Sequence, residues 1–406
     1  MLLSEETEPR FFELEKRGFI TNSDDIEYLQ YLQTNYSNDP RLFNLVVKEV
    51  LPDDMFTRIE ALLNISYNKL FENRRQAPNR IDMHTHSHSS DAYPTPCASV
   101  LEAYERGIRV LGALNHDTFS GICERMLAGK ILGMRVVPGI EISFGDSVLG
   151  HRVNNHIGVY FPEIESYDQF KVFLDLPDTF PFIERMEGIA RKRHESYLNL
   201  VDVYNSNAPF GVEISTEDVL RFARGGMVFG SHCGMALFDR YVKEMVMKDA
   251  KDGEKQFAKC IEFYSEEETI VGAELKEMMK DGWNLPTLEE VFEYAQKYHG
   301  AGVLVHPLDY HSDTDCALDI MEKIAELYRV SGIEVYVAKY PDKVPLIKER
   351  ADKINSGQLY NGGLVYSFGS DHHGKYGGSK QVMGGLEKFD LPSPSEFLER
   401  LRANCF

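Results

Sequence analysis

Short apolar runs alternate with amphipathic stretches from residue 80 onward. The apolar runs predict strands at residues 80–84, 110–117, 135–143, 153–161, 301–307, 333–337 and 363–373. The stretches between them carry apolar residues at three- and four-residue spacing, which predicts helices at 99–107, 124–133, 287–300, 317–332 and 344–357. This alternation is typical of a mainly parallel α/β sheet with its helices outside.

Two segments depart from this alternation. Residues 163–285 are strongly charged and largely helical, notably at 185–205 and 239–268, and they predict an inserted helical subdomain. Residues 1–79 show helical periodicity at 25–36, 41–50 and 54–72. The expected domains are therefore a helical N-terminal extension (1–79), an α/β barrel (80–162 and 286–406) and a helical insertion (163–285).

The charge of the chain restricts its partners. Formal net charge is −20, from 44 basic and 64 acidic residues. An acidic surface repels long polyanions, so we expect no binding to long nucleic acid, although a metal cluster would reverse the field locally. The six cysteines form no Cys-x-x-Cys pair and are expected to be reduced thiols of a cytoplasmic protein. Neither a signal peptide nor a membrane-spanning run is expected.

The densest chemical signal is the segment DMHTHSHSSD at residues 82–91. His84 and His86 stand two residues apart at the end of a predicted strand, where side chains at this spacing share one face. Two imidazoles on one face can supply two metal ligands, and Asp91 follows in the next loop. A lone His-x-His pair is weak support for a metal site, so the rest of the chain has to be considered.

Further candidate ligands recur at the predicted ends of later strands. In a (β/α) barrel these ends open on one face, so residues far apart in sequence would converge there. A single histidine at such a place is more often a packing residue, but a buried cluster of imidazoles and carboxylates is costly without a cation. Nitrogen and oxygen donors without thiolate suit Mn²⁺, Fe²⁺, Zn²⁺ or Mg²⁺. The nine predicted ligands are His84, His86, Asp91, His116, Glu141, His156, His306, Asp371 and His373.

The order of these motifs resembles the PHP superfamily, named for polymerase and histidinol phosphatase domains. The match includes His-Asp at 116–117, Gly-Ile-Glu at 139–141, His-Pro at 306–307 and Gly-Ser-Asp-His-His at 369–373, and it extends from residue 81 to about residue 390. The resemblance implies a distorted (β/α)7 TIM-like barrel that hydrolyses phosphate esters with three divalent ions. It also implies which ligands share an ion: His84, His86, Glu141 and Asp371 for one, Glu141, His156 and His306 for another, and Asp91, His116 and His373 for the last.

The insertion resembles that of nucleoside 3′,5′-bisphosphate phosphatases and related 5′→3′ oligoribonucleotide-trimming enzymes. In this branch an Arg-x-His stretch holds the scissile phosphate; His232 matches the histidine, but Gly230 stands at the arginine position. The branch has Gly-Arg after His-Pro, where this chain has Leu308 and Asp309. Both substrate-side arginines are therefore missing. Lys339 is the expected replacement and binds substrate with His232, while Arg240 and Arg224 are weaker candidates.

The predicted mechanism places Glu141 and His232 at the reacting atoms. Glu141 would bridge two ions that activate a water for attack on phosphorus, and His232 would bind the phosphoryl group or protonate the leaving alcohol. Asn115 and Asp117 flank His116 and are candidate orienting residues. Apart from His232, the histidines outside the ligand set are His88, His151, His194, His299, His311 and His372, and exposure is expected for His88.

The leading functional hypothesis is a phosphomonoesterase for a small phosphorylated metabolite, such as a nucleotide or nucleoside bisphosphate. The enzyme alternatives are a 5′→3′ exonuclease on short oligonucleotides and a histidinol-phosphate phosphatase. The alternative of another class is a metal-binding regulatory module without catalysis. Phosphate release from a panel of substrates, with and without a chelator, discriminates between them.

Overall fold

The computed structural model describes residues 58–59, 62, 80–223, 226–244, 259–260, 263, 269–357, 363–374, 383 and 392–406. The predicted N-terminal helices at 25–36 and 41–50, most of the helix at 54–72, and residues 245–258 of the helical stretch at 239–268 lie outside these residues. The boundaries of the three predicted domains remain predictions.

Seven strands form one sheet in sequence order, β1 to β7. A bridge between Thr85 and His372 and the hydrogen bond from His86 N to His372 O (3.1 Å) join the two ends of the sheet into a nearly closed barrel. The predicted distorted seven-stranded α/β barrel is thus confirmed. The strands are β1 (Arg80–Thr85), β2 (Ile108–Ala113), β3 (Arg135–Val148), β4 (His151–Tyr160), β5 (Ala301–Leu304), β6 (Gly332–Val337) and β7 (Val365–Gly369).

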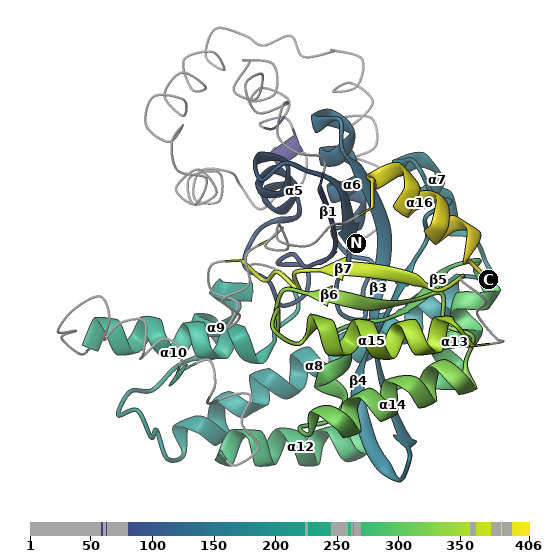
Figure 1. Ribbon diagram of the computed structural model, residues 1–406. Coiled ribbons are helices and arrows are strands. Elements are labelled where there is room, and N and C mark those ends of the chain that lie inside the picture. The colour runs from purple at the N-terminus through teal and green to yellow at the C-terminus, as the bar shows by residue number, and fades with distance from the viewer. Residues whose placement is uncertain are drawn as a thin grey trace, which may run out of the picture.

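The helices lie outside the barrel (Figure 1). Those that follow barrel strands directly are α5 (Pro96–Glu105), α6 (Ile122–Leu132), the 3₁₀ turn η2 (Pro307–Tyr310) with α14 (Thr314–Leu327), and α15 (Val344–Asn355). Between β4 and β5 lie α7 (Tyr167–Asp175), α8 (Phe180–Asn205), α9 (Thr216–Ala223), α10 (Gly230–Glu244), α12 (Ile270–Gly282) and α13 (Leu288–Lys297). A last helix, α16 (Pro394–Ala403), was not predicted from the periodicity.

The expectation of a mainly parallel sheet needs one correction, at β4. This strand pairs antiparallel with both β3 and β5, whereas β1–β2, β2–β3, β5–β6 and β6–β7 are parallel. The reason is the short connection: β3 continues to Val148 and turns at Leu149 and Gly150, which have φ of 53° and 84°. A two-residue turn joins antiparallel strands, whereas a parallel crossover needs about a dozen residues.

Three apolar clusters hold these layers together. The largest lies between the sheet and its helices. The second joins inward residues of β1, β2, β3, β5 and β7 to Phe397 and Leu401 of α16, so the last helix packs onto the barrel strands. The third contains only residues between Leu200 and Val271, so the helices after β4 pack around an apolar cluster of their own.

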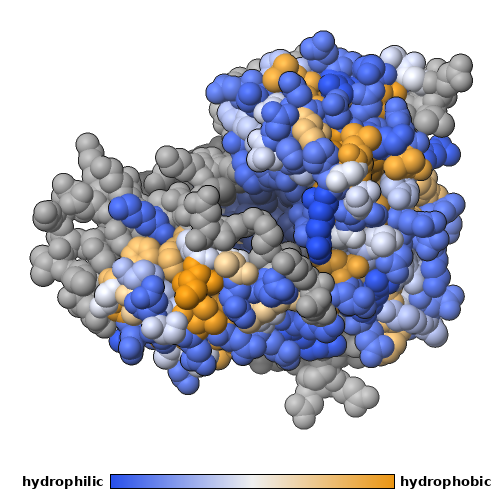
Figure 2. Space-filling view, turned by 90° about the horizontal axis from the view of Figure 1, so that it is seen from below, coloured by the Kyte–Doolittle hydropathy of each residue, from blue (hydrophilic) through white to orange (hydrophobic). Residues whose placement is uncertain are grey.

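Among the described residues, no helix combines the length and the apolar character that crossing a bilayer requires. The face seen in Figure 2 is predominantly hydrophilic and is hollowed near its middle. All six cysteines are free, as expected from their spacing. The cytoplasmic location stays a prediction.

Candidate metal centre

His84 and His86 meet at the end of β1, as their spacing predicts. Their Nε2 atoms lie 3.0 Å apart, and both side chains are fully buried. Each Nε2 is also 3.2 Å from Oε2 of Glu141, which β3 contributes. The loop after β7 brings Oδ1 of Asp371 to 3.3 Å from His86 Nε2 and 3.6 Å from His84 Nε2. Four residues from three strands therefore meet at one point.

The second carboxylate oxygen of Glu141 faces two other histidines. Oε1 is 2.9 Å from His306 Nε2 and 3.2 Å from His156 Nδ1. The sequence analysis placed His156 at the C-terminal end of its strand, and this placement is wrong. It pairs with Ser143 in the middle of the antiparallel β4, and it reaches the centre because β3 and β4 continue beyond the parallel strands.

A third group lies around Asp91. Its Oδ2 is 2.9 Å from His373 Nε2 and 3.3 Å from His116 Nε2, and its Oδ1 is 3.7 Å from His86 Nδ1. His116 also points its Nδ1 toward Glu141 Oε2, at 3.2 Å. The structure thus brings together all nine predicted ligands. It also shows that His86 and His116 each lie between Glu141 and Asp91. The assignment of ligands to three ions, as the family resemblance implies it, gives each of these histidines to one ion only.

The spacing and hydrogen bonding of these atoms fit bound cations. Two ligand atoms that each lie ~2.1 Å from one ion are about 3–3.4 Å apart, which is the range found around Glu141. Five buried polar atoms here have no hydrogen-bond partner, which is costly unless another group satisfies them. They are Nδ1 of His86, His116, His156 and His306, and Oε2 of Glu141.

The charges of the cluster favour ligation as well. Burial raises the pKa of Glu141, but His116, His84 and His156 together hold it well below its usual range. Burial lowers the pKa of His156 to about 4, so its ring is neutral and has a free lone pair at pH 7. The pKa of His373 is shifted in the opposite direction. Despite burial, Asp91 and Asp371 raise it to about 9, so a metal cation would displace a proton from this ring.

Two ligands depend on an unusual backbone. His306 has a φ of 28° and Asp371 a φ of 53°, the left-handed region that side chains rarely occupy. Glu334 Oε2 accepts the backbone N–H of His306 at 2.7 Å, and the carbonyl of His84 accepts that of Asp371 at 2.9 Å. Such strain persists where the surroundings enforce it, and it is common at functional sites.

Glu334, on β6, was missed by the sequence analysis. It is fully buried, and its Oε1 lies 3.1 Å from Nδ1 of His84. Asp82 was missed as well; its Oδ1 accepts the N–H groups of His84 and Ser370, at 3.3 and 3.0 Å. An acidic residue inside an otherwise apolar strand, as in IEVYV at 333–337, is the signal that could have identified Glu334.

The predicted orienting residues Asn115 and Asp117 hold loops. Asn115 accepts the N–H of Ser87 (3.0 Å) and donates to the carbonyl of Ser120 (2.7 Å). Asp117 accepts the N–H and hydroxyl of Ser143, at 2.7 and 2.8 Å. Both are fully buried beside His116.

The helices after β4 reach this centre at α10. His232 is fully buried; its Nδ1 accepts the N–H of Phe229 (3.1 Å), and its Nε2 has no partner. Burial lowers the pKa of His232 to about 4, and the charges of Asp91 and His373 also act on it, which places it on the Asp91 side of the cluster. The hydroxyl of the neighbouring Ser231 donates to the carbonyl of Asp91 at 3.1 Å.

Two of the predicted substrate-side cations already have ion-pair partners. Lys339 forms an ion pair with Asp309, the residue that stands where the resembling branch has arginine. Arg240 pairs with Asp218 at 3.0 Å, and Arg224 lies outside the described residues. The expected exposure of His88 is wrong, because it is buried in the loop before Asp91, where its carbonyl lies against the backbone of Gly226.

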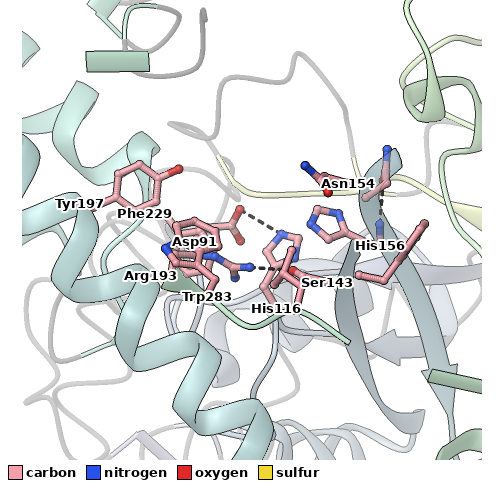
Figure 3. Close-up of a pocket in the computed structure, with 12 residues that line it drawn as sticks. Asp91, His116, Ser143, Asn154, His156, Arg193, Tyr197, Phe229 and Trp283 are labelled. Carbon is pink, nitrogen blue, oxygen red and sulfur yellow. Dashed lines mark hydrogen bonds and ion pairs between the residues drawn. The ribbon is translucent and has the colours of Figure 1, made fainter. Parts of the chain in front are cut away.

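A cavity of about 250 Å³ opens beside the cluster (Figure 3). Asp91, His116 and His156 border it on the cluster side, while Tyr197, Phe229 and Trp283 form aromatic walls. Arg193 of α8 also lines it, a residue that the sequence analysis did not identify. Its position inside a long charged helix gave no signal that would set it apart from its neighbours Arg191 and Lys192.

Comparison with solved structures identifies the fold. An inferred metal-dependent phosphoesterase from Bifidobacterium adolescentis aligns with 82% of this chain and 98% of its own, with a TM-score of 0.56 and 19% identity. An amidohydrolase from Chromobacterium violaceum, solved with sulfate and without metal, aligns with 79% and 96%, with a TM-score of 0.54 and 20% identity. The chain therefore shares the α/β barrel fold of these two structures. The barrel that the motif resemblance implied is thereby confirmed.

Curated sequences match shorter parts of this chain. A 5′-3′ exoribonuclease from Haemophilus influenzae is 41% identical over 64 residues, 16% of this chain and 23% of the relative. A phosphoribosyl 1,2-cyclic phosphate 1,2-diphosphodiesterase from Eggerthella lenta is 38% identical over 73 residues, 18% of this chain and 28% of the relative. The chain thus spans about a quarter of the length of these relatives. No family model matches it.

Proposed function

We propose that this chain is a metal-dependent phosphomonoesterase for a small phosphorylated metabolite, namely a nucleotide or nucleoside bisphosphate. One observation carries this proposal: nine imidazole and carboxylate side chains converge, with buried donor atoms that lack hydrogen-bond partners. The names of the two curated relatives and of one structural neighbour support the same reaction class, hydrolysis of phosphate esters.

The residues present fit divalent ions such as Mn²⁺, Fe²⁺, Zn²⁺ or Mg²⁺, and three ions would use all nine ligands. Bound ions would supply Lewis-acid activation of water and of the phosphoryl group. Glu141 is the proposed bridging ligand, because each of its oxygens faces a different set of histidines. The remaining work, which is orientation of the substrate, falls to side chains around the cavity.

His232 is proposed to bind the phosphoryl group as a hydrogen-bond donor. Its Nδ1 accepts a backbone N–H, so the proton of the neutral ring is on Nε2. Nε2 is buried and has no partner within the protein. A neutral imidazole donates a hydrogen bond to an anionic oxygen, and this geometry favours binding over protonation of the leaving alcohol, the other role considered from the sequence.

The cavity favours a small substrate with a planar ring. A volume of about 250 Å³ suits one nucleotide-sized ligand better than a long strand. Three aromatic side chains, Tyr197, Phe229 and Trp283, border the space beside His116, and such walls stack well on a nucleobase. The net charge of −20 opposes long polyanions at a distance.

The test is phosphate release from mononucleotides, nucleoside 3′,5′-bisphosphates, histidinol phosphate and sugar phosphates, each with Mn²⁺ and with EDTA. We expect nucleotides to be the best substrates, with activity abolished by EDTA. A Glu141→Gln variant gives the background of contaminating phosphatases. Stepwise release of mononucleotides from short RNA, at a higher rate than from any monoester, would instead identify a 5′→3′ exonuclease. Metal binding without hydrolysis of any substrate would support the regulatory module and overturn the proposal.

A further inference from the structure

We propose that Arg193 of α8 binds the substrate phosphate, in addition to His232 of α10. It would take over the task of the two arginines that are absent at Gly230 and at Leu308–Asp309. The inference rests on the proposed function, because it assigns a phosphoryl group to the cavity beside the metal centre. It adds a binding residue on α8, an element that carries none of the predicted site residues.

Arg193 is held in place from one side of its guanidinium group. Its Nη2 donates to Oδ2 of Asp117 and to the hydroxyl of Ser143, both at 2.6 Å. Asp117 in turn follows His116, one of the proposed metal ligands. The guanidinium is therefore tied to the rim of the barrel, although Arg193 itself belongs to α8.

Two aromatic rings fix its plane. The guanidinium carbon lies 5.0 Å from the ring centroid of Phe229 and 4.9 Å from that of Trp283. These distances are within the range of cation–π contacts, which stabilise a cation on an aromatic face. Both rings also line the cavity. An arginine held in this way is already oriented before a ligand arrives, so little side-chain entropy is lost on binding.

The other nitrogen of the group is free to bind a ligand. Nη1 is buried and has no hydrogen-bond partner among the described residues, while Arg193 as a whole is only 5% exposed. A buried N–H donor without an acceptor is unfavourable, so a ligand oxygen at this position is favoured. Among the described residues that line the cavity, Arg193 is the one arginine, and none is a lysine.

The cavity connects this donor to the proposed metal ligands. In Figure 3 the guanidinium of Arg193 extends toward His116 and Ser143, on the same side as Asp91. A phosphoryl group held at the ions near His116 and Asp91 would present its outer oxygens to Nη1. Charge-assisted N–H···O contacts of this kind are the usual way in which arginine recognises phosphate.

Lys339 is the competing cation. It already pairs with Asp309, and that carboxylate also lies 3.5 Å from Nδ1 of His306. Lys339 does not line the cavity as described. Its charge is balanced, and it has no orphaned donor like Nη1 of Arg193.

The experiment measures binding of inorganic phosphate to the Mn²⁺-loaded full chain by calorimetry, which requires no turnover. Arg193→Met should weaken phosphate binding at least ~10-fold, because a hydrogen bond to a charged group is lost. Arg193→Lys, which keeps the charge beside Phe229 and Trp283, should lose less, and it replaces Arg193→Met if that variant does not fold. The matched control is Arg185→Met, on the same helix. Nη1 of Arg185 lies 2.7 Å from Oε1 of Glu290, and Arg185 does not line the cavity.

A structural role is tested with Asp117→Asn, which removes the anionic partner of Nη2 and leaves Nη1 intact. If Arg193 only neutralises the charge of Asp117, Asp117→Asn and Arg193→Met will weaken phosphate binding equally. The proposal requires a much larger loss of phosphate affinity for Arg193→Met. Manganese content should match the wild type in both. Wild-type phosphate affinity in Arg193→Met overturns the inference. Phosphate binding through Arg193 in a protein that hydrolyses nothing would refute the proposed function and leave the inference standing.

Discussion

Glu334 and His84 lie 250 positions apart in sequence, yet Oε1 of the glutamate is 3.1 Å from Nδ1 of the histidine in the barrel interior. The same carboxylate holds the backbone of His306 through its other oxygen. Carboxylates behind metal-binding histidines fix the ring orientation and raise the basicity of the ligand. Glu334 is therefore positioned to control two proposed metal ligands without binding an ion itself.

We expect Glu334→Gln to weaken metal affinity about 10- to 100-fold, since it removes the charge behind His84. The measurement is a Mn²⁺ titration followed by activity and by calorimetry. Glu326→Gln is the control, because Glu326 is an exposed partner of Lys323 on α14. Equal metal affinity in the two variants would contradict the role given to Glu334.

Loss of the bridging carboxylate should be more damaging than loss of a peripheral one. Glu141 faces His84 and His86 through one oxygen and His306 through the other, whereas Asp91 faces His116 and His373. Glu141→Gln should lose more bound metal per chain than Asp91→Asn, and its turnover should fall ~10³-fold or more. Elemental analysis after gel filtration gives the metal content. Equal losses would show that Glu141 does not bridge.

Removal of His232 should separate substrate binding from metal binding. We expect His232→Ala to reduce turnover about 10- to 100-fold, the value of one hydrogen bond to a charged group, at unchanged metal content. His232→Gln, which can keep a donor, should retain more activity. Wild-type turnover in His232→Ala would exclude this residue from the mechanism.

Gly369 is predicted to tolerate no side chain. A Cβ atom there would lie 1.6 Å from Oε1 of Glu334 and 2.6 Å from Cβ of His84. Gly369→Ala should therefore lower the free energy of unfolding by about 1–3 kcal/mol and displace the pair that orients the metal centre. In Gly188→Ala, on α8, the new methyl group would lie 3.9 Å from Nη2 of Arg191, an ordinary van der Waals contact, and should stabilise the helix by about 0.5–1 kcal/mol. Urea denaturation compares the two.

Acid should weaken a buried pair near the end of β7. Burial raises the pKa of Glu102, but His372 and Arg106 more than offset it and lower this pKa to about 2. A depressed carboxyl pKa contributes stability that is complete above the unfolded value near 4.5 and is lost as pH falls toward 2. In metal-free protein, Glu102→Gln should thus lose up to about 3 kcal/mol at pH 7, and the difference should shrink between pH 4.5 and pH 2. A pH-independent difference would contradict this assignment.

The sequence by itself predicted the barrel and the residues that converge at the candidate metal centre. Strands and helices at short, regular spacing require a sheet covered by helices, and strand-end histidines such as His84, His116 and His306 could be recognised from position alone. This works because strand periodicity and chain direction are local properties. The same local rules wrongly predicted His156 at the C-terminal end of a parallel strand. The turn at Leu149–Gly150 makes β4 antiparallel, and His156 lies within that strand.

The tertiary structure decided which residues support and extend the site. Glu334 and Asp82 are acidic residues within strands, and Arg193 is one of several charged residues on a long helix, so the sequence does not show what any of the three contacts. Their roles follow from contacts with residues 50 to 288 positions away: Arg193 contacts Ser143, Glu334 contacts His84, and Asp82 contacts Ser370. A buried charge is stable only where its partners happen to fold against it, and packing of the whole barrel and of the helices after β4 sets that arrangement.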